Sequence, residues 1–371
     1  MKQYYQKMIL LVLWIIIQGF LLWQNGVVTT EEAEKYISEA EYFLKTGNFS
    51  RNSFWLYSTQ IFLIAATIKL QLSYTVVIIV QLLLNLYATL MFFKLAQFFL
   101  KNSILSFLVT FFFIINIPYQ AYNSFLFTES IFYSLTVIYS SFLLRLNKLT
   151  INNLIIIIVF LALISITRPT GILFFGATAF YIFFRFLSNI NLWKKLAIIC
   201  SALIIFFATL NSMLQIGGSL NFMISFKMEY IVCGVNTTSE NVEIKTLENG
   251  NSLRGILYYF FNNGKQFFRL SILKTISFFG LVRNYYSPFH NILLVIFFYP
   301  FYLLSLVGAW KMFRRKEQTF FYMAAIIVLF WITVLLTCDD WHNRFVLPIL
   351  PFIFLMGLSV FKKADSIKER T

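Results

Sequence analysis

The stretch MILLVLWIIIQGFLLW (Met8–Trp23), followed by NGVVTTEEAEKYISEAEYFLKTGNFS (Asn25–Ser50), decides the fold class. The first part is an apolar run of the kind that enters a bilayer. The second part gathers five of the chain's 15 Asp and Glu residues between Glu31 and Glu41. No small-residue cleavage site separates the two parts, so we interpret the run as a retained first span and not as a cleaved signal peptide.

The whole chain repeats this apolar character. It is 59% hydrophobic and 12% charged, with a mean hydropathy of +0.76, which lies outside the range of soluble domains. We therefore predict an all-α polytopic membrane protein built as a bundle of about 10–12 transmembrane helices. Segment 54–72 carries Lys69 and could lie in the interface without crossing. The candidate spans are 8–23, 54–72, 74–93, 104–118, 126–146, 153–167, 171–187, 193–214, 291–310, 319–337 and 344–361.

The net charge of +15 comes from Lys and Arg in the connectors between spans. This distribution follows the positive-inside rule and predicts that both termini are cytoplasmic. It does not predict nucleic acid as a partner, because the basic residues do not cluster on a soluble face. The expected partner is the lipid bilayer. Frequent Ile, Phe, Asn and Lys suggest an AT-rich genome, and we expect a bacterial inner-membrane protein of a surface-glycan pathway. The basic connectors are Arg145–Lys148, Asn191–Lys195, Lys311–Lys316 and the C-terminal tail.

Three regions follow from this alternation. Residues 1–214 form a transmembrane module with a first outer loop at 24–53. Residues 215–290 form an extracytoplasmic region with amphipathic helices near 253–282, and residues 291–371 form the last spans and a short cytoplasmic tail. The cysteines, Cys200, Cys233 and Cys338, are odd in number and widely spaced, so no disulfide framework is predicted.

Within the first outer loop, apolar residues follow helical spacing from Ala33 to Leu44, which predicts an amphipathic helix on the outer surface. Thr29 or Thr30 is expected to cap its start, in a capping box with Glu32, and Gly47 to end it. A solvated face explains most of its glutamates. Glu31 and Glu32, at the start of the helix, are candidates for function.

Other ionisable residues stand at the outer ends of separate spans, where a charge close to hydrocarbon is costly and marks a functional candidate. Glu129 could instead cap a helix together with Thr128, and Arg168 and Arg344 could be ordinary interface arginines. Asp339, Asp340 and His342 could hold a divalent metal ion, although their spacing matches no specific motif.

These charged candidates share one side of the predicted membrane, and very few ionisable residues fall in the middle of a span. A transporter needs polar groups near the midplane. An enzyme that acts on a lipid-linked substrate needs them at the level of the headgroups. The asymmetry therefore favours catalysis at the outer surface.

The order of these motifs resembles the GT-C membrane glycosyltransferases, in particular the branch that uses polyprenyl- or dolichyl-phosphate sugars. The protein O-mannosyltransferases and aminoarabinose transferases belong to that branch. The resemblance covers most of the chain as a pattern, and each motif is weak by itself. It rests on Tyr36, Ala40, Leu44, Gly47 and Phe49 after an acidic position, TES (Thr128–Ser130), RPTG (Arg168–Gly171) and HNRFVLPILP (His342–Pro351).

The resemblance implies a GT-C-like bundle and an inverting transfer of sugar from a polyprenyl-phosphate donor to a glycan, lipid or protein acceptor. In that family a first-loop acid, usually Asp four residues before the tyrosine, is catalytic, and Glu32 stands at this position. The implied roles are catalytic for Glu32, its neighbour Glu31 and Glu129, and substrate-binding for Arg168, Arg344, His342 and Tyr36.

Two other functions remain open. An O-antigen-type polysaccharide polymerase or ligase would depend on arginines of the 215–290 region, namely Arg254, Arg269 or Arg283. A flippase or transporter of lipid-linked sugars would need a polar cavity inside the bundle. Polar residues available inside the predicted spans are Gln18, Gln81, Asn85 and Asn211.

Overall fold

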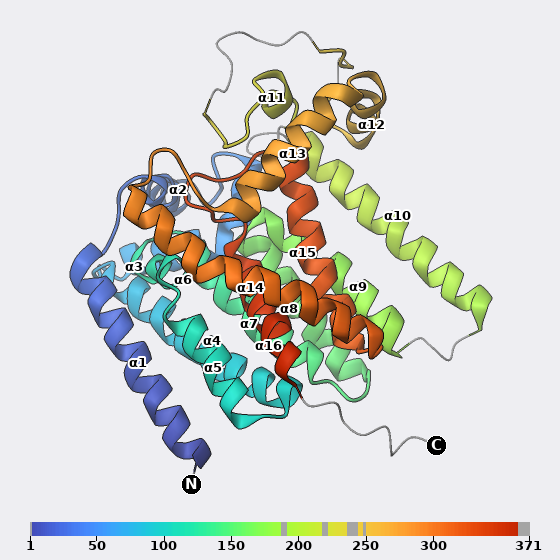
Figure 1. Ribbon diagram of the computed structural model, residues 1–371. Coiled ribbons are helices and arrows are strands. Elements are labelled where there is room, and N and C mark those ends of the chain that lie inside the picture. Colours follow the sequence, from blue (N-terminus) through green and yellow to red (C-terminus); the bar gives the residue numbers. More distant parts are fainter. Residues whose placement is uncertain (1, 187–190, 217–221, 236–243, 248–249, 363–371) are drawn as a thin grey trace.

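The structure, a computed structural model, describes residues 2–186, 191–216, 222–235, 244–247 and 250–362 (Figure 1). In this part of the chain the regular structure is helical, apart from two isolated β-bridges. The predicted all-α class is confirmed. The predicted tail from residue 363 onward, and sections 217–221, 236–243 and 248–249 of the predicted 215–290 region, lie outside the described residues.

The elements follow one another with short connections. The first half contains α1 (Lys2–Asn25), α2 (Glu32–Thr46), η1 (Asn52–Tyr57), α3 (Ser58–Lys69), α4 (Thr75–Leu100), α5 (Ser103–Ile114), α6 (Ile117–Gln120), η2 (Ala121–Ser124), α7 (Glu129–Leu144), α8 (Ile151–Thr167), η3 (Pro169–Ile172) and α9 (Leu173–Phe186). The second half contains α10 (Leu192–Ile216), α11 (Phe222–Lys227), α12 (Leu253–Asn262), α13 (Gly264–Gly280), α14 (Pro288–Arg314), α15 (Gln318–Leu336), η5 (Leu347–Ile349), α16 (Leu350–Leu358) and η6 (Ser359–Phe361).

Five of these helices are long and apolar enough to cross a bilayer, which fits a multi-pass membrane protein. A sixth span results if α5 and the α6–η2 segment, which meet at a 61° bend, count as one. Pro118 stands in the first turn of α6, just after this bend. The five helices are Gln3–Asn25, Thr75–Leu100, Pro169–Phe186, Pro288–Arg314 and Gln318–Leu336.

The described structure therefore shows fewer full-length spans than the predicted 10–12. Helices occupy nearly all of the predicted ranges, but several are shorter than a span, such as the apolar helices Glu129–Leu144 and Ile151–Thr167. Segment 54–72 divides into η1 and the 12-residue α3. At 1.5 Å per residue, α3 is about 18 Å long, which is too short to cross a hydrocarbon core about 30 Å thick.

Helix α7 forms the centre of the bundle, because nearly every one of its residues is buried. Helix α4 packs along α7, α9 along α15, and α14 along α16. Figure 1 shows α2, α11, α12 and α13 at one end of this bundle, whereas α1 begins at the opposite end. We call the first of these the α2 end.

Helix α2 packs on α3 and buries Ala33, Tyr36 and Ala40, as the helical spacing predicts. Gly47 ends it in the left-handed region, with φ 73°. The prediction that Glu39 lies on a solvated face is wrong. Its carboxylate is buried and accepts hydrogen bonds from Ser50 N and Ser50 Oγ, both at 2.6 Å, which holds the loop after the helix.

Replacing Glu39 by alanine should destabilise the protein by about 1–3 kcal/mol, because the loop loses two hydrogen bonds to a charged acceptor. Thermal unfolding of the detergent-solubilised protein would measure the loss. Glu41→Ala is the matched control, since Glu41 is exposed on the same helix. Equal stability of the two variants would show that the Glu39–Ser50 contact contributes nothing.

Cys233 and Cys338 form a disulfide, so the prediction of no disulfide is wrong for this pair. The two residues are 105 apart in sequence, but the bridge between Val232 and Asp339 brings their backbones together, with Cα atoms 5.1 Å apart. Sequence spacing does not reveal such a tertiary contact. Cys200, on α10, is exposed and unpaired.

Candidate functional site

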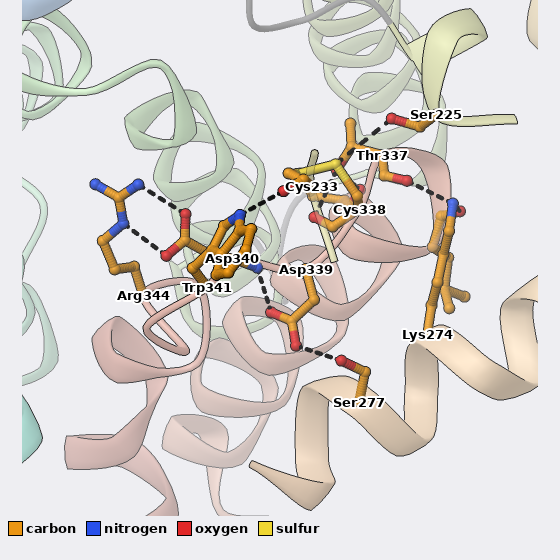
Figure 2. Close-up of a disulfide and its surroundings, with 12 residues drawn as sticks. Ser225, Cys233, Lys274, Ser277, Thr337, Cys338, Asp339, Asp340, Trp341 and Arg344 are labelled. Atoms are coloured by element: carbon orange, nitrogen blue, oxygen red, sulfur yellow. Dashed lines mark hydrogen bonds and ion pairs between the residues drawn. A yellow bond between two sulfur atoms is a disulfide. The ribbon is translucent and has the colours of Figure 1, made fainter. Parts of the chain in front are cut away.

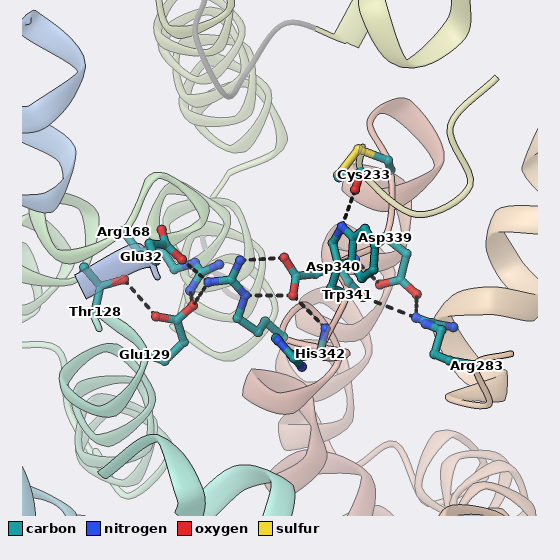
Figure 3. A network of polar contacts seen from close by, with 12 residues as sticks. Glu32, Thr128, Glu129, Arg168, Cys233, Arg283, Asp339, Asp340, Trp341 and His342 are labelled. Atoms are coloured by element: carbon teal, nitrogen blue, oxygen red, sulfur yellow. Dashed lines mark hydrogen bonds and ion pairs between the residues drawn. A yellow bond between two sulfur atoms is a disulfide. The ribbon is translucent and has the colours of Figure 1, made fainter. Parts of the chain in front are cut away.

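Three carboxylates and two guanidiniums from four separate segments meet at the α2 end (Figure 3). Glu32 is the first residue of α2, and Glu129 is the first residue of α7. Arg168 joins α8 to η3, and Asp340 and Arg344 lie in the loop between α15 and η5. We call these five residues the charged cluster. It brings together residues that the sequence predicts to lie at the same membrane surface.

Arg344 is the centre of the charged cluster. Its Nη1 contacts Glu32 and also lies 2.9 Å from Glu129 Oε1. Its Nε and Nη2 each donate to one oxygen of Asp340, both at 2.7 Å, in a two-pronged pair. Such forked pairs are stronger and more directional than single contacts. Arg344 therefore holds three acids of distant origin in one place.

Glu129 is fully buried and pairs with both Arg168 and Arg344. Thr128 Oγ1 donates to the second oxygen of this carboxylate at 3.2 Å. Thr128 precedes α7 but does not cap the helix with its side chain, so this part of the alternative interpretation is wrong. A buried carboxylate needs such partners, since an unpaired charge would be very costly there.

The RPTG motif sets the position of Arg168. Gly171 N donates to Arg168 O at 2.8 Å in a tight turn, and Pro169 opens η3. A Cβ on Gly171 would lie 2.4 Å from the backbone oxygen of Ile164, so only glycine fits this approach to α8. The turn directs Arg168 toward Glu129. Its guanidinium also lies over the ring of Phe345, 5.8 Å from the centroid.

Glu32 is the most accessible carboxylate of the cluster, with 25% of its side chain exposed, against 9% for Asp340 and none for Glu129. Tyr36 donates its hydroxyl to Glu32 Oε1 at 2.7 Å, and Lys35 Nζ lies 3.7 Å from the same oxygen. Burial alone would raise the pKa of Glu32, but Arg344 and Arg168 outweigh it and lower the pKa to about 2. Glu32 is therefore ionised at neutral pH.

The start of α2 differs from the predicted capping box. The helix begins at Glu32, and the preceding residue, Glu31, has φ 58° and provides no side-chain cap. Thr29 and Thr30 therefore do not cap the helix. Glu31 is exposed and makes none of the contacts of the charged cluster. Of the two neighbouring glutamates, only Glu32 reaches the site.

The suggested metal ligands have other partners. Asp339 pairs with Arg283, and Asp340 with Arg344. His342 is exposed, and its backbone N–H donates to Asp340 Oδ1 at 3.0 Å. Among the described residues, no three His, Cys, Asp or Glu side chains are grouped to hold a metal ion. These residues do not fit a metal centre, and we assign no metal to the site.

Asp340 is the member of the cluster whose role the sequence does not predict. The sequence contains one clue to the contact between Asp340 and Arg344, which is their spacing of four residues. That spacing implies a contact only in a helix, and this segment is a loop. Burial alone would raise the pKa of Asp340, but the forked pair with Arg344 lowers it. Burial raises the pKa of the adjacent Asp339, despite its pairing with Arg283.

A scan against models of known protein families, a search of curated proteins and a search of solved structures each find no match to this chain.

Proposed function

We propose that the protein is a GT-C-type membrane glycosyltransferase that transfers a sugar from a polyprenyl-phosphate donor to an acceptor hydroxyl at the α2 end. The meeting of Glu32, Arg168 and Arg344 at one boundary of the bundle carries the proposal. Such a donor needs cations for its phosphate and a carboxylate for the acceptor proton. The charged cluster holds both kinds of group within contact distance.

The reaction would begin when the donor phosphate binds Arg168 and Arg344, for which guanidinium forks are well shaped. Phosphate and Glu32 then compete for Arg344, which frees the glutamate. The acceptor oxygen attacks the anomeric carbon as its proton passes to Glu32. The bond from that carbon to the phosphate oxygen breaks with its electrons, so the configuration inverts.

Two other residues change their expected roles in this scheme. Glu129 is fully buried and bound to both arginines, so it positions the phosphate ligands and does not touch the acceptor. Tyr36 is also fully buried, and its hydroxyl bond to Glu32 orients the carboxylate. We therefore assign both as positioning residues.

The disulfide supports an extracytoplasmic location of the site, because such bonds persist in oxidising compartments. Cys233–Cys338 lies next to Asp339 and Asp340, at the α2 end. Together with the basic connectors between spans, this supports a site outside the cytoplasm and cytoplasmic termini. A bacterial inner membrane is the corresponding proposed location.

The arginines of the polymerase alternative have other surroundings. Arg269 pairs with Glu229, Arg283 is buried against Asp339, and Arg254 is exposed on α12.

The polar residues of the transporter alternative also have packing partners. Gln18 bonds Gln120, Asn85 accepts from Trp14, Gln81 donates to Phe125 O and Phe127 O, and Asn211 accepts from Leu253 N. These four polar side chains are used in contacts between segments of the bundle, which favours transfer over the transporter alternative.

The proposal is tested in proteoliposomes that contain a polyprenyl-phosphate sugar with a radioactive label. Transfer would convert the lipid-linked label into a product that resists mild acid and would release prenyl phosphate. The polymerase alternative predicts loss of activity in Arg254→Ala, which our assignment leaves active. Movement of label between leaflets without any transfer would overturn the proposal in favour of a transporter.

The pH dependence of transfer should differ between free and donor-bound protein. A base works only when deprotonated, so the rate falls as the pH drops through its pKa. In the free protein the pKa of Glu32 is about 2, so kcat/KM should show no acid limb from Glu32 until that pH is approached. Donor phosphate would pair with Arg344 in place of Glu32, so burial would raise the pKa of Glu32. As the pH falls, kcat should therefore begin to decline at a higher pH than kcat/KM does. Coinciding acid limbs would contradict the competition for Arg344.

A further inference from the structure

The loop that carries Arg344 is held from outside the membrane bundle. It follows α15 and leads to η5, and it carries Asp339, Asp340 and Arg344. Asn343, in the same loop, has φ 56°, a left-handed conformation that is uncommon for a residue with a side chain. A loop of this kind keeps its shape only when its surroundings determine it.

The first restraint is the segment around Cys233 (Figure 2). Its disulfide to Cys338 is flanked by backbone bonds from Cys233 N to Asp339 O and from Asp339 N to Ile231 O, both at 2.8 Å. Trp341 Nε1 donates to Cys233 O at 2.6 Å. One covalent bond and three hydrogen bonds thus fix both sides of Asp339.

The second restraint is α13 and the residues after it. Lys274 Nζ donates to Leu335 O at 3.2 Å and to Thr337 O, which satisfies carbonyls at the end of α15. Ser277 Oγ donates to Asp339 Oδ2 at 2.9 Å, and Arg283 pairs with the same oxygen. Lys274 and Ser277 are three residues apart, so they reach from one face of the helix.

The Asp339 side chain connects these two restraints to the charged cluster. Asp339 Oδ2 is held by Arg283 and Ser277, and its Oδ1 accepts from Asp340 N at 2.8 Å. Asp340 in turn presents both of its oxygens to Arg344. A continuous chain of contacts leads from Arg283 through Asp339 and Asp340 to Arg344.

We propose that Asp339, Arg283 and the Cys233–Cys338 disulfide are positioning elements that hold Arg344 for the phosphate of a prenyl-phosphate donor. The inference rests on the proposed function and extends it, because it makes binding of the donor depend on a segment that does not touch it. Partners that orient a binding residue typically contribute about 10- to 100-fold to affinity or activity, as is known for metal ligands.

The test measures binding of farnesyl phosphate, a donor analogue without sugar, to the full-length protein by tryptophan fluorescence. Cys233→Ser and Arg283→Met should each weaken binding about tenfold, by the loss of positioning. Arg283→Lys keeps the charge but loses the additional guanidinium hydrogen bonds to backbone oxygens, so it should restore part of the affinity. Cys200→Ser and Arg254→Met, which alter exposed residues, should bind as the wild type does.

Hydrogen exchange of residues 338–346 in the same variants reports the order of the loop without any ligand. Faster exchange together with weaker binding supports the inference. Unchanged affinity in variants that fold would overturn it. Loss of folded protein with normal affinity in the remainder would also overturn it, because the contacts would then serve stability alone.

The proposed function can fail separately. Wild-type protein that binds farnesyl phosphate but transfers no sugar would refute the glycosyltransferase assignment, while the variant affinities would still decide whether these residues position Arg344. Wild-type protein that transfers sugar but does not bind farnesyl phosphate would overturn the inference that Arg344 is positioned as a phosphate ligand. The glycosyltransferase assignment would then stand.

Discussion

Replacing Glu32 by glutamine is expected to lower kcat for sugar transfer by about 10²- to 10⁴-fold, the usual contribution of a general base. Glutamine has the same size, and its single oxygen can accept from Arg344 while its amide N–H donates to the Tyr36 hydroxyl, so both neighbours keep a hydrogen bond. It cannot take the proton of the acceptor hydroxyl. Single-turnover transfer at saturating donor would measure the loss without the steps of product release.

Two neighbouring glutamates are controls for this result. Glu34→Gln alters an exposed residue of the same helix and should leave kcat unchanged. Glu31→Gln separates the two candidates that the sequence places side by side, and its kcat should also stay near wild type. Loss of activity in Glu31→Gln with normal activity in Glu32→Gln would show that the wrong acid had been assigned.

Replacing Arg344 by methionine should destabilise the protein by about 3 kcal/mol, since removing one partner of a buried ion pair leaves uncompensated charge. Asp340 would lose its forked partner and Glu129 one of its two cations. Binding of farnesyl phosphate should be lost as well. Thermal unfolding and ligand binding, measured on the same sample, would separate the two effects.

A double substitution shows whether the uncompensated charge causes the loss of stability, and whether the loss of binding is independent of it. Arg344→Met combined with Asp340→Asn removes the acid that was left unpaired, so it should regain part of the lost stability but none of the binding. Arg344→Lys should remain more stable than Arg344→Met, yet bind weakly, because lysine lacks the fork. Wild-type stability in Arg344→Met would contradict the central place of this residue in the cluster.

Much of this arrangement could be predicted from composition and position. Long apolar runs give the helices, and the cost of charge near hydrocarbon marks Glu129, Arg168 and Arg344 as unusual. The number of full spans could not be predicted in the same way. An apolar run does not show where a helix ends, and α7 ends after 16 residues.

The features that could not be predicted depend on contacts between distant segments. Glu39 resembles its exposed neighbours until Ser50 folds back onto it. Asp340 has no helix to bring it to Arg344, and Cys233 has no sequence signal that points to Cys338. The start of α2 also differs from the expected capping box, because that pattern does not account for the pairing of Glu32 with Arg344.

The separation of 312 residues between Glu32 and Arg344 has a consequence for biogenesis. A ribosome makes the two glutamates of the cluster and Arg168 long before it makes Arg344. During that interval Glu129 has a single guanidinium partner and Glu32 has none from the cluster. The nascent protein therefore lacks the cation that pairs with Glu32 and Glu129 until the loop that carries Arg344 has been made. Chains that terminate early would keep these carboxylates without that partner, and membrane proteases could recognise such chains.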